Sequence, residues 1–311
     1  MSQLPKVSVV VPVRNGGELL SRAVRSVLAQ DYPRERTEIL VVDNGSTDDS
    51  ADRAKRLGVL LLVENRPGAS HARNRGLESA TGDVVAFADA DCEVKADWLT
   101  RLVEALASAD AVMGRIEPFP GGNRFARARA ALHELFLQEC IRLDHEDRLD
   151  RFDTANAAAW RHVLVAAGGF NPQVLYVEDR ELGARIAERG GRVKFTAAAL
   201  ALHHYEQRLL ASMRKAEGTG RIWAKFPDLF SMDVLRRHFA DVLKLLAAAP
   251  AFSSPLRHRL LRARFWLHVT AATVRPGFDN CLRHFRAAER LAMLHGIVSA
   301  ADGRQTRSPQ P

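Results

Sequence analysis

Two aspartates one residue apart follow a short apolar run, and their spacing could bring both carboxylates to one spot. The run Val84–Phe87 comes after Thr81-Gly82, a pattern typical of a buried strand that begins at a turn. Residues two apart in an extended chain point the same way, so Asp89 and Asp91 can face one ligand. Magnesium and manganese ions prefer oxygen ligands and leave positions for substrate phosphates. We therefore interpret the pair as a metal and phosphate site, against the plainer interpretation of loop acids that cap the next helix.

A second acidic pair, Glu178-Asp179, stands where a helix is expected to begin. Leu182 and Ile186 continue as the apolar face of that helix, so both acids fall in its first turn. The helix dipole favours ionised carboxylates at this position. An ordinary acidic helix start would explain the pair without any chemistry, and the pair alone does not decide between the two interpretations.

Alternating strands and helices would carry several acids to one edge of a sheet. The apolar strand runs are Val7–Val13, Glu38–Val42, Val59–Val63 and Val84–Phe87, with helical stretches between them. Further strand runs are expected at Ala111–Ile116, Arg192–Thr196 and Ala197–Leu202. This alternation predicts an α/β protein with a mostly parallel sheet and helices on both faces, in which ligands bind at the carboxyl ends of the strands. Asp43, Asp89 and Asp91 would all lie at that edge.

The composition indicates a globular protein whose charge is unevenly distributed. The 311 residues are 47% hydrophobic, enough for a packed core, and the net charge is +8. Residues 207–311 hold 18 Lys and Arg against 7 Asp and Glu, a net charge of +11, whereas residues 1–206 are near −3. A basic tail on a mildly acidic body is typical of an enzyme attracted to an anionic surface, either lipid or a phosphate-bearing acceptor.

We expect three segments: an α/β domain at 1–206, a basic helical extension at 207–301 and a disordered polar tail at 302–311. The cysteines are scattered without disulfide or zinc spacing, which favours a reducing compartment. No stretch is typical of a signal peptide or a membrane span. A cytoplasmic location is therefore expected, and the tail allows peripheral contact with the inner face of the plasma membrane.

A dinucleotide-binding dehydrogenase would share the first strand and helix but needs a Gly-x-Gly-x-x-Gly turn between them. The chain has Val13-Arg14-Asn15-Gly16-Gly17-Glu18 instead. Acids stand where that fold has glycines, which favours phosphates bound through a metal over phosphates bound by bare backbone amides.

Four blocks of sequence together resemble the family 2 glycosyltransferases. The blocks read VSVVVPVRNGGELLSRAVRSVLAQDYP, EILVVDNGSTDDS, NRPGASHARNRGLESATGDVVAFADADCE and TANAAAWRHVLVAAGGFNPQVLYVEDRELGARIAERGGRV, so the resemblance covers residues 6–204. It implies the Rossmann-like GT-A fold, a nucleotide-diphosphate sugar as donor, and a divalent metal, manganese or magnesium, as cofactor.

The resemblance also implies residue roles. The nucleotide-sugar-binding residues would be Pro12, Val13, Arg14, Asp43, Arg73, Asp89, Ala90 and Asn156, with Asp43 facing the base and Asp89 the ribose. An exposed arginine at Arg73 and a plain helix cap at Asn156 remain competing interpretations. The metal ligands would be Asp91 and one of His203 and His204. Alternation along a strand puts the two histidines on opposite faces, and we choose His203.

The Glu178-Asp179 pair resembles the family's catalytic acids. An inverting transfer needs a carboxylate that takes the proton of the acceptor hydroxyl, and we assign this base to Asp179, with Glu178 in support. The opposite assignment is not excluded by the sequence.

We predict a non-processive inverting glycosyltransferase, since the Gln-x-x-Arg-Trp block of processive members is absent. Its acceptor would be a glycan, a lipid-linked sugar or a small molecule in cell-surface polysaccharide, glycolipid or other glycoconjugate synthesis.

A sugar nucleotidyltransferase is the enzymatic alternative, although Arg14-Asn15-Gly16-Gly17 is a poor phosphate loop for it. A non-catalytic membrane- or nucleic-acid-binding protein is the other alternative; basic residues interleaved with aromatics on a strand are not found, so we expect no nucleic acid partner.

Overall fold

The structure is a computed structural model that describes residues 4–147, 149–174 and 176–205, with short helical pieces between 213 and 221 and between 287 and 293. The helical extension expected at 207–301 lies largely outside the described residues, and the tail expected at 302–311 lies entirely outside them.

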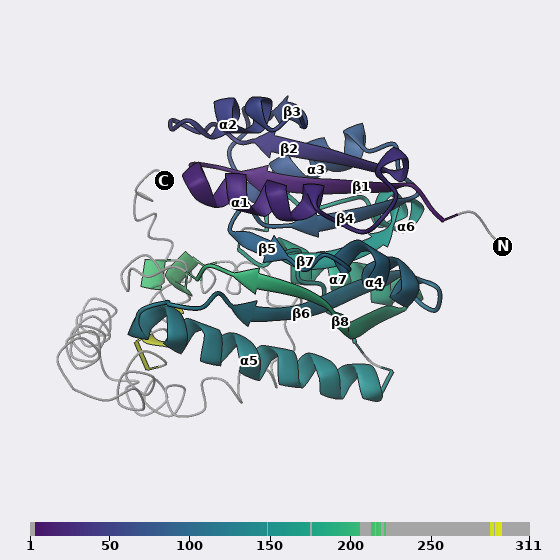
Figure 1. Ribbon diagram of the computed structural model, residues 1–311. Helices are drawn as coiled ribbons and strands as arrows, with labels where there is room; N and C mark the ends of the chain where they lie inside the picture. Colours follow the sequence, from purple (N-terminus) through teal and green to yellow (C-terminus); the bar gives the residue numbers. More distant parts are fainter. Residues whose placement is uncertain are drawn as a thin grey trace. The chain divides into compact units, whose positions relative to one another are not determined.

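The described strands form one mixed sheet (Figure 1). They are β1 (Val7–Val13), β2 (Thr37–Asp43), β3 (Leu60–Val63), β4 (Val84–Ala88), β5 (Cys92–Val94), β6 (Ala111–Pro118), β7 (Asn156–Trp160) and β8 (Val193–His203). Their order across the sheet is β3-β2-β1-β4-β7-β6-β8-β5. Only β5 and β7 run antiparallel to their neighbours, so the mostly parallel sheet predicted from the sequence is confirmed.

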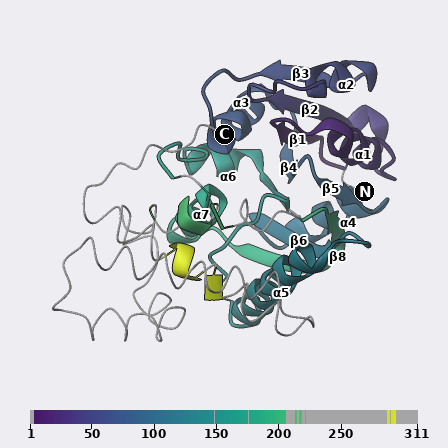
Figure 2. The ribbon, with the colours of Figure 1, turned by 90° about the vertical axis from the view of Figure 1, so that its left-hand side faces the viewer.

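Helices cover both faces of this sheet. They are α1 (Gly17–Leu28), α2 (Ser50–Arg56), α3 (Ala69–Ser79), α4 (Trp98–Leu106), α5 (Arg124–His145), α6 (Arg161–Ala166) and α7 (Glu178–Glu188), with a 3₁₀ turn at Arg34–Arg36. In Figure 2, α1 and α4 lie on one side of the strands, and α3, α6 and α7 lie on the other. The described helices are too short or too polar to cross a membrane.

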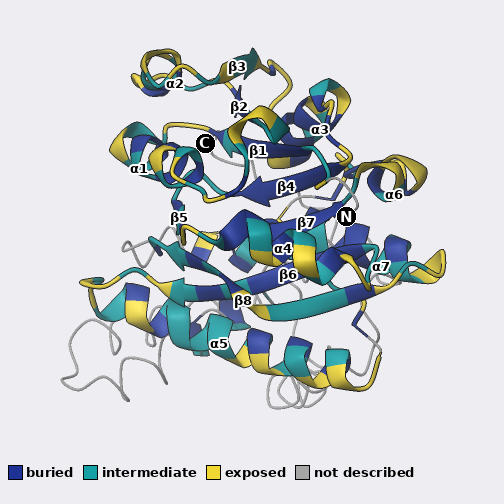
Figure 3. Cartoon of the chain, turned by 45° about the vertical axis from the view of Figure 1, so that its right-hand side comes forward, coloured by how far each residue is buried: buried dark blue, intermediate teal, exposed yellow. Residues whose placement is uncertain are grey.

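The pleat of β1 explains why both faces need helices. Val7, Val9, Val11 and Val13 point into a core shared with α1 and α4, while Val10 points into the opposite core with α3 and α7. The central strands are therefore buried on both sides, as their dark blue colour in Figure 3 shows. Continuous apolar runs in the sequence predicted these strands for the same reason.

Two strands were not predicted, and both help to build the functional edge. Because β7 is antiparallel, its first residue, Asn156, pairs with Ala88 at the carboxyl end of β4. Likewise Cys92 of β5 pairs with His203 at the end of β8. These pairings bring the segments before β7 and after β8 to the edge at which β1, β2 and β4 end.

By its contacts the chain divides into two compact units, residues 1–120 with 133–205 and residues 121–132 with 206–311. The sequence placed one boundary at 206, whereas the structure assigns the first part of α5 to the second unit. In that unit Ala128 packs with small and apolar side chains that include Met213, Ala216, Ala288 and Ala292.

Candidate active site

Loops at the carboxyl ends of β1 and β2 are tied together by side chains that bond to backbone amides. Asn15 Oδ1 accepts a hydrogen bond from the Thr47 amide at 2.7 Å, and Ser50 Oγ accepts one from the Gly16 amide at 2.9 Å. The first amides of α1 have no partner within the helix, so Ser50, the first residue of α2, supplies one for Gly16. Asn15 was not expected at the site from the sequence; it adopts a left-handed backbone (φ +56°) that asparagine tolerates better than most residues.

Asp43 lies at this edge and is almost buried, with 7% of its surface exposed. Its Oδ1 accepts a hydrogen bond from the Ser46 amide at 3.2 Å, and Oδ2 has no hydrogen-bond partner among the described residues. The next residue, Asn44, donates to the carbonyls of Glu64 and Arg66 and accepts from the Gly68 amide. Asn44 thus joins the loops after β2 and β3, and Asp43 keeps an acceptor oxygen for a ligand.

The three residues expected at the end of β1 differ in exposure. The Val13 side chain is 3% exposed and packs in the core, so only its backbone could reach a ligand. Pro12 is half-buried and Arg14 is exposed. Asn44 also donates its backbone amide to the Val13 carbonyl at 2.8 Å, which ties the end of β1 to the Asp43 loop.

Arg73 joins two acidic groups that are far apart in the sequence. From α3, its Nη2 donates to Asp89 Oδ1 at 2.9 Å and its Nη1 donates to Glu178 Oε1 at 2.7 Å. The side chains of Arg73 and Glu178 are 7% and 9% exposed, and that of Asp89 is 32% exposed. Burial opposes the charged form, but Asp89, Glu178 and Asp179 together raise the pKa of Arg73, so it stays protonated. Arg73 is thus not the exposed helix-face arginine that the sequence left as an alternative.

Asp91 and His203 form the group that could hold a metal ion. His203 Nε2 lies 3.3 Å from Asp91 Oδ1, and the Asp91 side chain is 41% exposed. A carboxylate oxygen with an imidazole nitrogen suits manganese-like ions. Cys92 lies within reach, and burial, with the nearby Asp91 and Asp89, raises the pKa of its thiol. Its sulfur suits a hard ion such as magnesium or manganese less well than a carboxylate oxygen does.

The structure distinguishes the two adjacent histidines. His204 Nε2 lies 2.7 Å from Glu93 Oε1, to which Arg22 also pairs at 2.7 Å, and the His204 ring stacks on Phe119 with centroids 3.9 Å apart. The two imidazoles therefore engage different carboxylates: that of His203 lies against the Asp91 carboxylate, whereas His204 meets Asp91 only through its backbone amide, which donates to the Asp91 carbonyl. Half-buried Ala90 separates Asp91 from Asp89.

Asp179 lies in the first turn of α7, close to a carboxylate that the sequence analysis missed. Its Oδ1 accepts a hydrogen bond from the Arg180 amide at 2.8 Å, and its Oδ2 accepts a longer one from the Thr154 amide at 3.4 Å. Burial, together with the charge of Asp153, raises the pKa of Asp179, while Arg73 and Arg180 partly oppose this shift. Burial also raises the pKa of Asp153, against the effect of Arg180. The signal in the sequence was the position of Asp153 directly before the fourth block shared with the family, three residues before Asn156.

Thr154, directly after Asp153, is a second residue near Asp179 that the sequence did not lead us to expect there. It is 1% exposed, and its hydroxyl has no hydrogen-bond partner within the part of the chain that the structure describes.

Asn156 requires a correction to its expected role. Its side chain is fully buried, and Nδ2 donates to the carbonyls of Arg115 and Ala199 at 2.7 and 2.9 Å. Its Oδ1 accepts from Trp98 Nε1 at 2.7 Å. Asn156 is neither a helix cap nor placed to touch a donor sugar, because its amide joins β6, β7, β8 and α4 beneath the edge.

We expect Asn156→Ala to lower the free energy of unfolding by at least about 2 kcal/mol, because a buried group left without its partner costs about 1–3 kcal/mol. Denaturant unfolding would measure it. Gln173→Ala, in an exposed turn, is the control and should change stability by less than about 0.5 kcal/mol. Equal stability of the two variants would contradict the structural role of Asn156.

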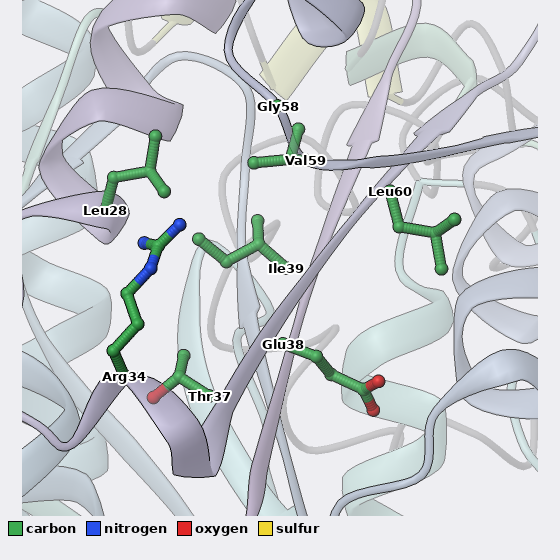
Figure 4. A pocket seen from close by; sticks show the side chains of 8 residues that line it. All are labelled: Leu28, Arg34, Thr37, Glu38, Ile39, Gly58, Val59 and Leu60. Atoms are coloured by element: carbon green, nitrogen blue, oxygen red, sulfur yellow. The ribbon is translucent and has the colours of Figure 1, made fainter.

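A pocket of about 240 Å³ lies away from this site (Figure 4). It is lined by the first residues of β2 and β3, with Leu28 and Arg34 from α1 and the turn after it. Because β2 and β3 are parallel to β1, these residues lie at the amino edge of the sheet, opposite to the edge that carries the acids.

Comparisons with known proteins agree with this architecture. Residues 8–165, just over half of the chain, match the model of glycosyl transferase family 2. The glycosyltransferase AglE of Haloferax volcanii is 28% identical over 257 residues, which cover 79% of this chain and 81% of AglE.

Two solved structures share the fold. The mannosyltransferase PcManGT from Pyrobaculum calidifontis, in complex with GDP-Man and Mn²⁺, has a TM-score of 0.67 at 23% identity, over 98% of this chain and 89% of that one. Glucosyl-3-phosphoglycerate synthase from Mycobacterium tuberculosis, with Mn²⁺, UDP and glucosyl-3-phosphoglycerate, has a TM-score of 0.53 at 22% identity, over 72% and 80%. The chain belongs to glycosyl transferase family 2, and it is a glycosyltransferase with the GT-A fold.

Proposed function

We propose that this enzyme moves a sugar from a nucleotide-diphosphate donor to an acceptor hydroxyl with inversion at the anomeric carbon, one sugar per encounter. The observation that carries the proposal is the gathering of acidic side chains at one edge of the sheet: Asp43 at the end of β2, Asp89 after β4, Asp91 beside His203, and Glu178 and Asp179 at the start of α7. A base, a ribose, a diphosphate and a reacting sugar follow one another in such a donor, and each would meet a group of suitable chemistry.

The nucleoside would bind between Asp43 and Asp89. Asp43 Oδ2 can accept a hydrogen bond from a ring N–H of the base, since an ionised carboxylate is only an acceptor. Asp89 uses Oδ1 for Arg73 and has Oδ2 left for a ribose hydroxyl. The backbone of Val13 and the side chains of Pro12 and Arg14 would complete the pocket.

Asp91 and His203 would hold a divalent ion, manganese or magnesium, against the diphosphate. When bound, the ion neutralises the negative charge that develops on the leaving nucleoside diphosphate. Two related enzymes of the same fold were solved with Mn²⁺, one with GDP-Man and one with UDP. The oxygen and imidazole donors at Asp91 and His203 are consistent with such an ion.

Asp179 would act as the general base. The acceptor oxygen forms the new bond to the anomeric carbon from the face opposite the leaving group, the bond to the diphosphate oxygen breaks, and the acceptor proton moves to the Asp179 carboxylate. Glu178 is a poorer candidate for the base because its Oε1 is bound to Arg73 in a buried ion pair.

Family membership sets aside the sugar nucleotidyltransferase and the non-catalytic binding protein as alternatives. For the acceptor we propose a glycan, a lipid-linked sugar or a small molecule in glycoconjugate synthesis, reached by a cytoplasmic enzyme that contacts the membrane peripherally. The support is the net charge of +11 in residues 207–311.

We expect the full-length protein to float with anionic vesicles at low salt and to be released as salt rises, since exposed charges are screened within about 10 Å at 0.1 M salt. Vesicles of neutral lipid at the same salt are the control. The absence of flotation, or flotation that ignores headgroup charge and salt, would contradict the membrane proposal.

Incubation with a panel of nucleotide-diphosphate sugars and candidate acceptors, in Mn²⁺, tests the function itself. We expect acceptor-dependent release of nucleoside diphosphate from one donor, with proton NMR showing a product anomer opposite to that of the donor. A product with the donor's anomeric configuration would exclude the inverting mechanism.

A further inference from the structure

The buried bridge made by Arg73 connects the donor end of the site to the catalytic end. One terminal nitrogen of its guanidinium binds Asp89, directly after β4, and the other binds Glu178, the first residue of α7. Asp89 and Glu178 are 89 positions apart in the chain, and the described residues around them form no backbone hydrogen bond with each other. Arg73 is therefore a direct side-chain link between them.

This bridge uses the specific shape of arginine. The planar guanidinium presents donors in a fixed fork, so two carboxylates can be bound at a set separation, which a lysine ammonium cannot reproduce. Both terminal nitrogens are engaged by protein carboxylates, and the buried Nε has no partner among the described residues. The two terminal nitrogens of Arg73 thus bind protein carboxylates, whereas the sequence led us to expect a contact with the nucleotide.

We propose that Arg73 is a positioning residue that links the donor-binding Asp89 to Glu178 and so holds Asp179 in place for proton abstraction. The inference rests on the proposed function, because it assigns Arg73 a part in the same transfer reaction. Asp179 follows Glu178 in the first turn of α7, so anchoring Glu178 also fixes the direction in which the Asp179 carboxylate can face. A misplacement of about 1 Å in a catalytic group can cost 10²-fold in rate.

The charge of Arg73 has a second effect on Asp179. Burial and Asp153 raise the pKa of Asp179, and Arg73 and Arg180 oppose that rise. Glu178 is the adjacent acid on α7, and its carboxylate is paired with Arg73. Removing the Arg73 charge should therefore raise the pKa of Asp179 further, and the acidic limb of the rate profile should move to higher pH.

Arg73→Gln and Arg73→Lys test the inference against wild type at saturating donor. For Arg73→Gln we expect kcat to fall by about 10²-fold, a smaller change in donor Kd, and an acidic limb displaced to higher pH. Arg73→Lys keeps the charge but not the fork, so kcat should fall while the limb stays near its wild-type position. Thermal unfolding and donor calorimetry establish that each variant is folded.

If Arg73→Gln loses donor affinity while kcat and the acidic limb stay unchanged, Arg73 contacts the nucleotide and the inference is wrong. Wild-type kcat in both variants would also overturn it. If Arg73→Gln does not fold, Arg73→Lys decides the matter by the same comparison of kcat with donor Kd. If the wild type transferred no sugar with any donor and acceptor, the proposed function itself would be wrong. Failure of the proposed function can therefore be distinguished from failure of the inference about Arg73.

Discussion

Asp179→Asn is expected to slow glycosyl transfer by roughly 10²–10⁴-fold, the usual contribution of a positioned general base, while donor affinity stays nearly the same. Asparagine keeps the size of the side chain, and its one oxygen can still accept from the Arg180 amide, the shorter of the two bonds to Asp179, but it cannot take up a proton. The loss should therefore appear in the chemical step and not in donor binding.

Single-turnover transfer at saturating donor, with donor Kd from calorimetry, measures the two effects separately. Asp43→Asn is the matched contrast, because it makes the same chemical change at the other end of the donor and should weaken donor affinity more than turnover. If Asp179→Asn transfers at the wild-type rate and Glu178→Gln does not, Glu178 is the base. If both variants remain active, the mechanism fails.

The pH dependence of the wild type follows from the same carboxylate. Burial and the charge of Asp153 raise the pKa of Asp179 above its ordinary value near 4. The base works only when deprotonated, so kcat should fall as the pH drops through this raised pKa, which lies above that of an exposed aspartate. A profile of kcat against pH at saturating donor measures it, and a limb at or below pH 4 would contradict the assignment.

Asp91→Asn is expected to abolish metal-dependent binding of the nucleoside diphosphate while the fold stays intact. A neutral amide oxygen is a much weaker ligand than a carboxylate for a hard divalent ion, and without the ion the diphosphate would lose its counter-charge. His203, 3.3 Å from the lost carboxylate, would remain as the single protein ligand of the proposed pair.

Asp97→Asn provides the control for that variant, because Asp97 has a similar side-chain exposure, 42% against 41% for Asp91, but pairs with Arg101 on the surface. Electron paramagnetic resonance of free Mn²⁺ measures the affinity for the metal, and calorimetry measures the affinity for the nucleoside diphosphate. Wild-type affinity for metal and diphosphate in Asp91→Asn would show that the metal site is misassigned.

The sequence predicted the parallel part of the sheet well because that part is recorded in local pattern. Val7–Val13 and Val84–Ala88 are buried on both faces, which requires continuous apolar residues, and Asp89 and Asp91 follow the second of these strands directly. By contrast β7 reads NAAAW, a run without strand propensity that becomes a strand only because β4 and β6 pair with it. Asn156 was misjudged for this reason.

At the site, too, the sequence predicted some features and not others. Motifs and strand order predict that Asp43, Asp91 and Glu178 lie near one edge of the sheet. They do not predict which charged side chains contact one another there, because the Arg73 bridge joins positions 105 residues apart and the closeness of Asp153 to Asp179 depends on the turn before β7. Likewise the separate roles of His203 and His204 depended on Glu93, Arg22 and Phe119, which come from three different segments.

Calorimetric titration of the wild-type protein with a panel of nucleoside diphosphates, with Mn²⁺ and with the metal removed by a chelator, shows whether the site binds a nucleoside diphosphate through a metal ion. We expect at least one nucleoside diphosphate to bind in Mn²⁺ and this binding to be largely lost without the metal. No binding by any nucleoside diphosphate in Mn²⁺, or equally tight binding without metal, would contradict it.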